Sequence, residues 1–211
     1  MIEAELEPGS GGRVLKNLLG IKRKREMDRV EWLEQLRALD DLVDIYGKGH
    51  RFSASDIRKM HKLWLGRIYK WAGVYRSVNM SKDGFPFAGA AQIPKLMSEF
   101  ERGSLRELTP CTFDRMEAVV NALAVVHVEL VLIHPFREGN GRLARMLSTL
   151  MALQAGLPPL DFGSIKGKRK REYFAAVQAG MDRNYEPMER IFSDVIGRTL
   201  RTRGKQRRPS S

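Results

Sequence analysis

The chain has 211 residues, of which 43% are hydrophobic and 29% are charged, which is the balance of a globular protein with one core and excludes a disordered or fibrous chain. A single cysteine, Cys111, excludes an internal disulfide bond. The most apolar region, 119–133, is interrupted by Asn121, His127 and Glu129, so we expect no membrane span. Because the chain starts with acidic residues and has no basic, apolar leader, we expect a cytoplasmic protein.

The formal net charge of +12 calls for an anionic partner or a solubility role. Much of it lies in the segment 166–171 and in the end of the chain, 198–211, which contains no acidic residue. We interpret 198–211 as a solvated basic C-terminal tail, with weak contact to nucleic acid as the alternative. No aromatic residues alternate with these cations, so the sequence shows no platform for stacking single-stranded nucleic acid.

Residues 1–50 are predicted to form an N-terminal arm followed by a helix at 26–46. The helix is predicted to bury the apolar residues that recur at helical spacing, which are Trp32, Leu33, Leu36, Leu39, Val43 and Ile45. A second helix follows, capped by Ser53 or Ser55 and continuing as far as Gly73.

The periodicity changes at 75–87, which reads as a β-hairpin with Asp83 and Gly84 at its turn. Pro86 lacks an N–H group, which restricts the second strand to a short edge strand. Further helices are predicted near 91–100, 113–133, 142–154, 170–180 and 185–200, and Thr112 or Asp114 caps the long central one. The predicted fold class is therefore mainly α, with one helical domain over 51–197 and one small hairpin.

One short run, His134-Pro135-Phe136-Arg137-Glu138-Gly139-Asn140-Gly141-Arg142, carries the chemistry, together with Arg145. Proline disfavours helical geometry in the residue before it, so the long helix should end at His134. The two glycines let backbone N–H groups turn toward an anion, and the next helix directs the positive end of its dipole to the same place.

The charged residues of this run complete a phosphate-binding site. Arg142 and Arg145 lie one helical turn apart and can reach the same anion. Glu138 can hold Mg²⁺ against phosphate oxygens. The pattern therefore indicates a phosphate-binding loop beside a histidine, whose ordinary pKa suits proton transfer near neutral pH.

The run from His134 to Arg145 resembles the signature of the Fic family, His-Pro-Phe-x-(Asp/Glu)-Gly-Asn-Gly-Arg-x-x-Arg, at every fixed position. Tyr69–Arg76 resembles the family's lead-in to its hairpin "flap", and Arg171–Ala176 resembles its later tyrosine-containing helix. The resemblance thus extends over about Ser53–Val195. It implies a Fic-fold helical core with a hairpin flap, and transfer of AMP from ATP to a hydroxyl side chain of another protein.

The resemblance also implies roles for the residues of the run. His134 would be the general base, and Glu138 would hold Mg²⁺ between the α- and β-phosphates of ATP. Asn140 and the loop backbone at Gly139 and Gly141 would stabilise the α-phosphate. The β- and γ-phosphates would be bound by Arg142 and Arg145, respectively.

The remaining expectations concern the surroundings of the run. The hairpin at 75–87 would bind an extended segment of the target protein as an added strand. Lys82 would contact the nucleotide or the target, with a simple turn position as the alternative. Tyr173 would line the adenine pocket, with core packing as the alternative, and His127 is interpreted as a core residue.

Regulation and the choice of donor leave alternatives open. Gly141 stands where kinase-like relatives of the Doc type have lysine, which favours AMP transfer, and a Fic enzyme with another nucleotide donor is an alternative. No Ser or Thr has Glu four residues later, so the internal inhibitory helix of many Fic proteins is not found. Either a small antitoxin supplies a glutamate to Arg145, as in toxin–antitoxin pairs, or an atypical segment within 1–46 or after 185 does so. The alternative from another class is a basic nucleic-acid-binding or adaptor protein whose site is inactive.

Overall fold

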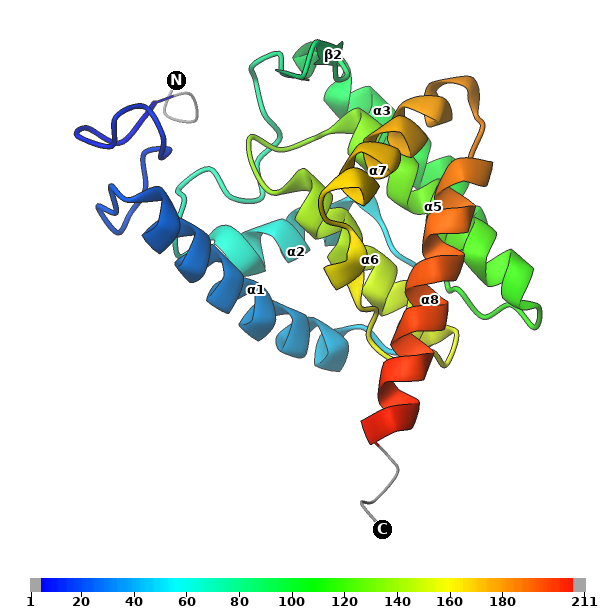
Figure 1. Ribbon diagram of the computed structural model, residues 1–211. Helices are drawn as coiled ribbons and strands as arrows, with labels where there is room; N and C mark the ends of the chain where they lie inside the picture. Colours follow the sequence, from blue (N-terminus) through cyan, green and yellow to red (C-terminus); the bar gives the residue numbers. More distant parts are fainter. Residues whose placement is uncertain (1–4, 207–211) are drawn as a thin grey trace.

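The computed structural model describes residues 5–206, and residues 1–4 and 207–211 lie outside the described part. As predicted, the described chain is mainly helical and carries one two-stranded hairpin (Figure 1). Its helices are α1 (Lys24–Ile45), α2 (Ala54–Leu65), α3 (Ile93–Phe100), α4 (Arg106–Leu108), α5 (Met116–Ile133), α6 (Asn140–Gln154), α7 (Lys168–Ala179) and α8 (Glu186–Gln206), and its strands are β1 (Ser81–Lys82) and β2 (Phe85–Pro86).

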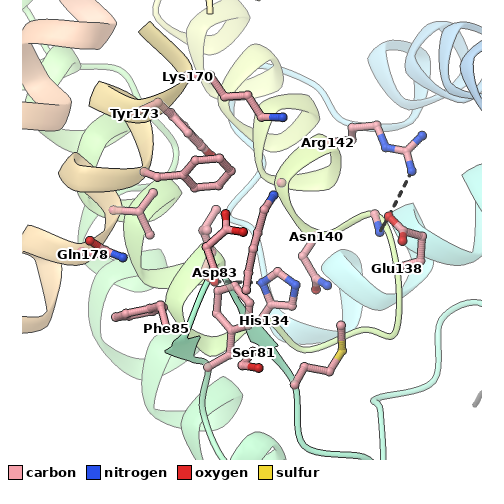
Figure 2. A pocket seen from close by; sticks show the side chains of 18 of the residues that line it. Ser81, Asp83, Phe85, His134, Glu138, Asn140, Arg142, Lys170, Tyr173 and Gln178 are labelled. Atoms are coloured by element: carbon pink, nitrogen blue, oxygen red, sulfur yellow. Dashed lines mark hydrogen bonds and ion pairs between the residues drawn. The ribbon is translucent and has the colours of Figure 1, made fainter. Parts of the chain in front are cut away.

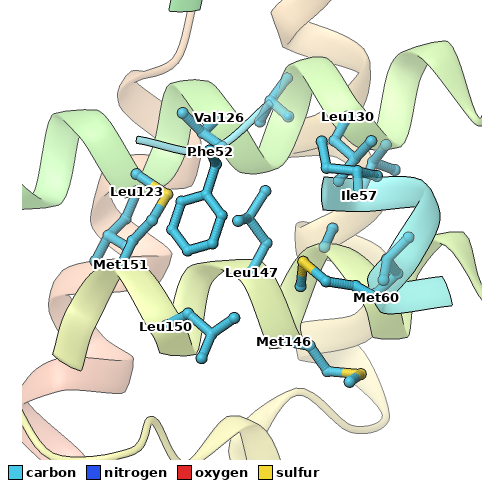
Figure 3. Packing of buried hydrophobic residues seen from close by; sticks show 14 of the residues in the cluster. Phe52, Ile57, Met60, Leu123, Val126, Leu130, Met146, Leu147, Leu150 and Met151 are labelled. Carbon is cyan, nitrogen blue, oxygen red and sulfur yellow. The ribbon is translucent and has the colours of Figure 1, made fainter. Parts of the chain in front are cut away.

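Helix α5 forms the centre of the core and packs against α3, α6, α7 and α8. Figure 3 shows Phe52 between α5 and α6, beside Leu123, Leu147 and Met151. By length and composition alone α5 is apolar enough to cross a membrane, contrary to the expectation from its three polar residues, but 61% of it is buried among the other helices. Packing inside the protein therefore accounts for its apolar surface.

The predicted apolar face of α1 is wrong. Trp32, Leu33 and Leu36 are about half exposed, and the face that packs against α2 and α6 carries Met27 and Glu31 instead, followed by Ala38 and Leu42. A carboxylate on the buried face is possible because Glu31 has charged and polar partners inside the protein, which the helical period of the sequence does not reveal.

The start of α2 agrees with the sequence, and its end does not. Ser53 is the N-cap, and it forms a capping box in which its side chain accepts from the Asp56 N–H at 3.1 Å and its own N–H donates to Asp56 Oδ2 at 3.0 Å. The helix ends at Leu65 rather than near Gly73. Trp71 is nevertheless buried, because the turns that follow α2 fold back over the core.

The two helices around the motif begin and end where its special residues lie. Helix α5 starts at Met116 without a side-chain cap, so Thr112 and Asp114 are not its N-cap, and it ends before His134, which adopts a left-handed conformation at φ 51°. Helix α6 starts at Asn140, directly after Gly139 at φ 84°. The motif thus forms a tight loop between two packed helices, with a residue in the left-handed backbone conformation at each end of the loop.

The hairpin is shorter than the sequence suggests. β1 and β2 pair antiparallel with Ser81 opposite Pro86 and Lys82 opposite Phe85, while 75–80 is not strand. Asp83 and Gly84 both have positive φ, 50° and 81°, as the predicted two-residue turn requires.

The basic C-terminal segment begins as helix rather than as a tail. Helix α8 continues to Gln206, and its residue Thr199 is buried and accepts a hydrogen bond from the Asp161 N–H at 2.9 Å. The end of the predicted tail, 207–211, lies outside the described residues.

Candidate active site

A pocket of about 390 Å³ lies between the hairpin, the loop after α5, the first turns of α6, and α7 (Figure 2). This volume is within the range of small-molecule sites. The pocket brings together all the site residues expected from the sequence, which are Lys82, His134, Glu138, Gly139, Asn140, Gly141, Arg142, Arg145 and Tyr173. In Figure 2, His134 and Asn140 lie near the middle, the Glu138–Arg142 pair on one side, and Tyr173 and Gln178 on the other.

His134 is held as a neutral imidazole. Its Nδ1 lies 3.2 Å from the Val131 carbonyl oxygen, so Nδ1 carries the proton and Nε2 carries the free lone pair. Phe87 stacks on the imidazole with 3.7 Å between ring centroids. Burial lowers the pKa of His134 to about 4, so the side chain is uncharged at neutral pH and able to accept a proton.

Asn140 uses both ends of its amide to shape the loop. Its Oδ1 accepts from the Phe136 N–H at 2.8 Å, and its Nδ2 donates to the Phe136 carbonyl at 2.7 Å. Phe136 is fully buried and anchors the loop in the core. The Asn140 side chain therefore orients the backbone N–H groups at the start of α6, and its predicted direct contact with the α-phosphate stays a prediction.

His61 supports this loop and was not identified from the sequence. Its ring stacks on Phe136 at 3.9 Å, and its Nδ1 accepts from the Gly73 N–H at 2.8 Å. Nε2 therefore carries the proton and donates to the Glu138 carbonyl at 3.0 Å. Its place on the buried face of α2 was a signal for burial, but nothing in the sequence pointed to Glu138.

Arg76 ties the base of the hairpin to the motif and was also missed. It is 2% exposed, and its guanidinium donates to the carbonyls of His134 at 2.7 Å, Val78 at 2.6 Å and Ala88 at 2.6 Å. Its backbone N–H donates to the Pro135 carbonyl at 2.9 Å. Since these partners are backbone atoms, no side-chain pattern in the sequence could predict them.

Glu138 fits the expected role of a magnesium ligand. Its side chain is 44% exposed at the pocket, where Oε1 accepts from the Gly139 N–H at 2.8 Å and lies 3.3 Å from Arg142. Within 5–206 there is no cluster of three His, Cys, Asp or Glu side chains that could form a complete metal cage. Mg²⁺ commonly binds through one or two carboxylates plus substrate phosphates, and one accessible carboxylate beside a phosphate loop suits that mode.

Tyr173 joins the pocket to a buried polar chain. Ser148 donates its hydroxyl proton to the Ala144 carbonyl at 2.8 Å, so at 3.1 Å it must accept from His127 Nδ1. His127 Nε2 then accepts from the Tyr173 hydroxyl at 2.8 Å. The phenol oxygen is left to accept from the pocket side, where Arg145 lies 5.5 Å from the ring centroid. The core position expected for His127 is correct, and Tyr173 combines core packing with a place in the pocket wall.

Lys82 reaches from the hairpin across the pocket to α7. Its Nζ lies over the Phe174 ring, 4.1 Å from the centroid. Burial, reinforced by the positive charge of Lys170, lowers its pKa. Lys82 therefore closes one side of the pocket and places a cation there.

Comparison with known proteins finds a matching family, a similar protein and similar solved structures. Residues 51–152 match the family model described as Fic/DOC. The chain is 35% identical over 152 residues, 71% of its length, to the protein adenylyltransferase VbhT of Bartonella schoenbuchensis, and it spans about 30% of the length of that relative.

Solved structures share the fold. BepC of Bartonella tribocorum, solved with bound AMPPNP, matches with a TM-score of 0.74 at 24% identity and covers 92% of this chain and 97% of its own. The N-terminal Fic domain of a VirB-translocated Bep effector from Bartonella quintana, solved with bound ADP, matches with a TM-score of 0.67 at 28% identity and covers 86% of this chain and 89% of its own.

Proposed function

Residues 51–152 belong to the Fic/DOC family, and on that premise we propose that this protein is an adenylyltransferase that transfers AMP from ATP to a Ser, Thr or Tyr hydroxyl of a target protein. The observation that carries the proposal is the neutral His134, whose Nε2 lone pair lies in the same pocket as the N-terminus of α6 and two arginines. The name of the 35%-identical relative and the ADP bound to the 28%-identical structure support it.

In the proposed reaction, His134 Nε2 accepts the proton of the target hydroxyl as its oxygen attacks the α-phosphorus of ATP. The bond from the α-phosphorus to the oxygen bridging to the β-phosphate breaks, and pyrophosphate leaves. The N–H groups at the start of α6, which have no partners within the helix, stabilise the charge on the α-phosphate oxygens. Arg142 binds the β-phosphate and Arg145 the γ-phosphate.

Glu138 would hold Mg²⁺, which when bound offsets the charge of the phosphates. The hairpin would present the target, because an extended segment can pair with the exposed edge of so short a ribbon. A cytoplasmic location would supply ATP and protein targets together.

We propose that inhibition comes from a separate small protein of the antitoxin type, which offers a glutamate to Arg145. Within 5–206, no carboxylate lies within ion-pair distance of Arg145, and its buried Nε has no hydrogen-bond partner. A carboxylate from a partner would compete there with the γ-phosphate of ATP.

The test is to incubate the purified protein with Mg²⁺ and ATP labelled at either the α- or the γ-phosphate in cell lysate, beside His134→Ala. The proposal expects protein-bound label from the α position only, lost in the variant. Label from the γ position would show a kinase. Absence of label, combined with salt-sensitive DNA binding, would favour the basic adaptor protein.

A further inference from the structure

We infer that Glu31 is a positioning residue that holds Arg142 in place for the nucleotide, so that α1 is part of the active site. The inference rests on the proposed function and extends it to a helix outside the family match at 51–152. Glu31 Oε2 forms an ion pair with an Arg142 terminal nitrogen at 2.7 Å.

Glu31 is itself fixed from three directions. Its Oε1 accepts from the Tyr69 hydroxyl at 2.6 Å, and its backbone carbonyl accepts from the Trp64 indole N–H at 2.8 Å. The side chain is 3% exposed, so water does not compete for the carboxylate. An ionised carboxylate that is so buried needs its cation, which makes the pair with Arg142 hard to break.

Arg142 is held on one side and accessible on the other. Its guanidinium lies over the Trp64 ring, 4.8 Å from the centroid, and its second terminal nitrogen lies 3.3 Å from Glu138 (Figure 2). The side chain remains 30% exposed toward the pocket. When Glu138 turns to Mg²⁺, the Glu31 pair and the Trp64 face still hold the guanidinium, and the nitrogen that Glu138 releases can donate to a phosphate oxygen.

A positioned arginine saves the cost of immobilising a long side chain upon binding. Removing the Glu31 carboxylate should therefore weaken the binding of ATP, which has a β-phosphate, and leave the binding of AMP unchanged, since AMP has none. If the role of Glu31 were purely structural, its removal would instead weaken the binding of both nucleotides equally, or lower thermal stability alone.

The experiment measures ATP and AMP affinity by calorimetry with Mg²⁺, in a His134→Ala background that prevents turnover. Glu31→Ala should bind ATP about threefold to tenfold more weakly with AMP unchanged. Glu31→Gln keeps an oxygen for Arg142 and should stay within about twofold of the parent. The matched control is Glu34→Ala, because Glu34 lies on the same helix and pairs with Arg37 and Arg67, away from the motif.

Tyr69→Phe is the second variant if Glu31→Ala does not fold, because it frees one oxygen of Glu31 and leaves the ion pair in place. It should show a smaller loss of the same ATP-selective kind. Two results for Glu31→Ala would overturn the inference: equal weakening of ATP and AMP binding, or unchanged ATP affinity. Tighter ATP binding by Glu31→Gln would also overturn it. A parent that binds neither nucleotide would overturn the proposed function and the inference with it, and this result is distinct from a parent that binds ATP regardless of Glu31.

Discussion

His134 determines how the proposed transfer responds to pH. A base acts only in its deprotonated form, and burial lowers the pKa of this imidazole from 6.5 to about 4. We therefore expect kcat/KM for AMP transfer to stay level from pH 7.5 to about 5 and to fall only as the pH approaches 4. An ordinary histidine would already lose activity near pH 6.5.

The matched variant for this prediction is Phe87→Ala, which removes the ring stacked on the imidazole. More water then reaches His134, its pKa rises toward the ordinary value, and the acid limb of the pH profile should move to higher pH. A wild-type limb centred near 6.5, unchanged by Phe87→Ala, would contradict a desolvated base.

At the residue scale, the sequence predicted the site residues that follow one another in the chain, from His134 to Arg145. The motif residues meet in one pocket because α5 ends directly before His134-Pro135 and Gly139, at positive φ, turns the chain into α6, in which Gly141 is an ordinary helical residue. Arg76 and His61 could not be predicted, because their partners are backbone atoms brought close only by the tertiary fold. Glu31 was not identified from the sequence, because its partner Arg142 is far away in the chain.

At the scale of elements, the loop between α5 and α6 depends on Gly139. A Cβ at this position would lie 2.8 Å from the Trp64 ring, and the φ of 84° already disfavours a side chain. Gly139→Ala should therefore lower the free energy of unfolding by more than the ~1–2 kcal/mol of a left-handed residue alone. It should also weaken ATP binding, because the start of α6 shifts with the loop.

Gly156→Ala separates the two effects. Gly156 has a similar φ of 76°, but a Cβ added there would meet no atom within 4 Å, so only the backbone cost applies. Urea unfolding of both variants measures the difference. Equal losses of stability would show that the Trp64 contact yields without cost and that the loop has more room than its packing indicates.

Element boundaries show why periodicity alone was incomplete. In α1 the apolar residues at helical spacing outnumber the residues that pack against the core, so the period selected the wrong face. In α2, by contrast, the capping chemistry of Ser53 placed the start of the helix correctly. The hairpin turn was predictable because Asp83 and Gly84 accept positive φ, but strand length depends on pairing, which ends after two residues on each side.

At the scale of the whole molecule, three of the four histidines are uncharged near neutral pH, two of them fully buried (His61 and His127) and one partly buried (His134), which links folding to pH. Burial lowers the pKa of His61 to about 4, of His127 to about 3 and of His134 to about 4. Each of the three has one ring nitrogen that donates to a protein oxygen, and His61 and His127 also accept a hydrogen bond that protonation would break.

The sign of the pH effect follows from these pKa values. In the unfolded chain the histidines take up protons near pH 6.5, whereas in the folded protein they do so only near pH 3–4, so the unfolded state binds more protons in between. The stability contributed by the neutral histidines is complete above pH 6.5 and is lost as the pH falls toward the folded pKa values. Unfolded carboxyl groups titrate below this range and add little above pH 5.

We therefore expect the free energy of unfolding, measured with urea, to fall by about 4 kcal/mol between pH 7.5 and 5.5, because each histidine contributes about 1.4 kcal/mol per pH unit below 6.5. His134→Ala should fall by only about 2.7 kcal/mol over the same range, since it removes one of the three titrating groups while leaving the core histidines in place. A wild-type loss no larger than that of the variant would mean that His134 does not titrate differently in the folded and unfolded chains. Acid sensitivity of the fold and the availability of a neutral base in the pocket thus share the same kind of physical cause, because desolvation keeps all three imidazoles neutral, two of them in the core and His134 at the pocket.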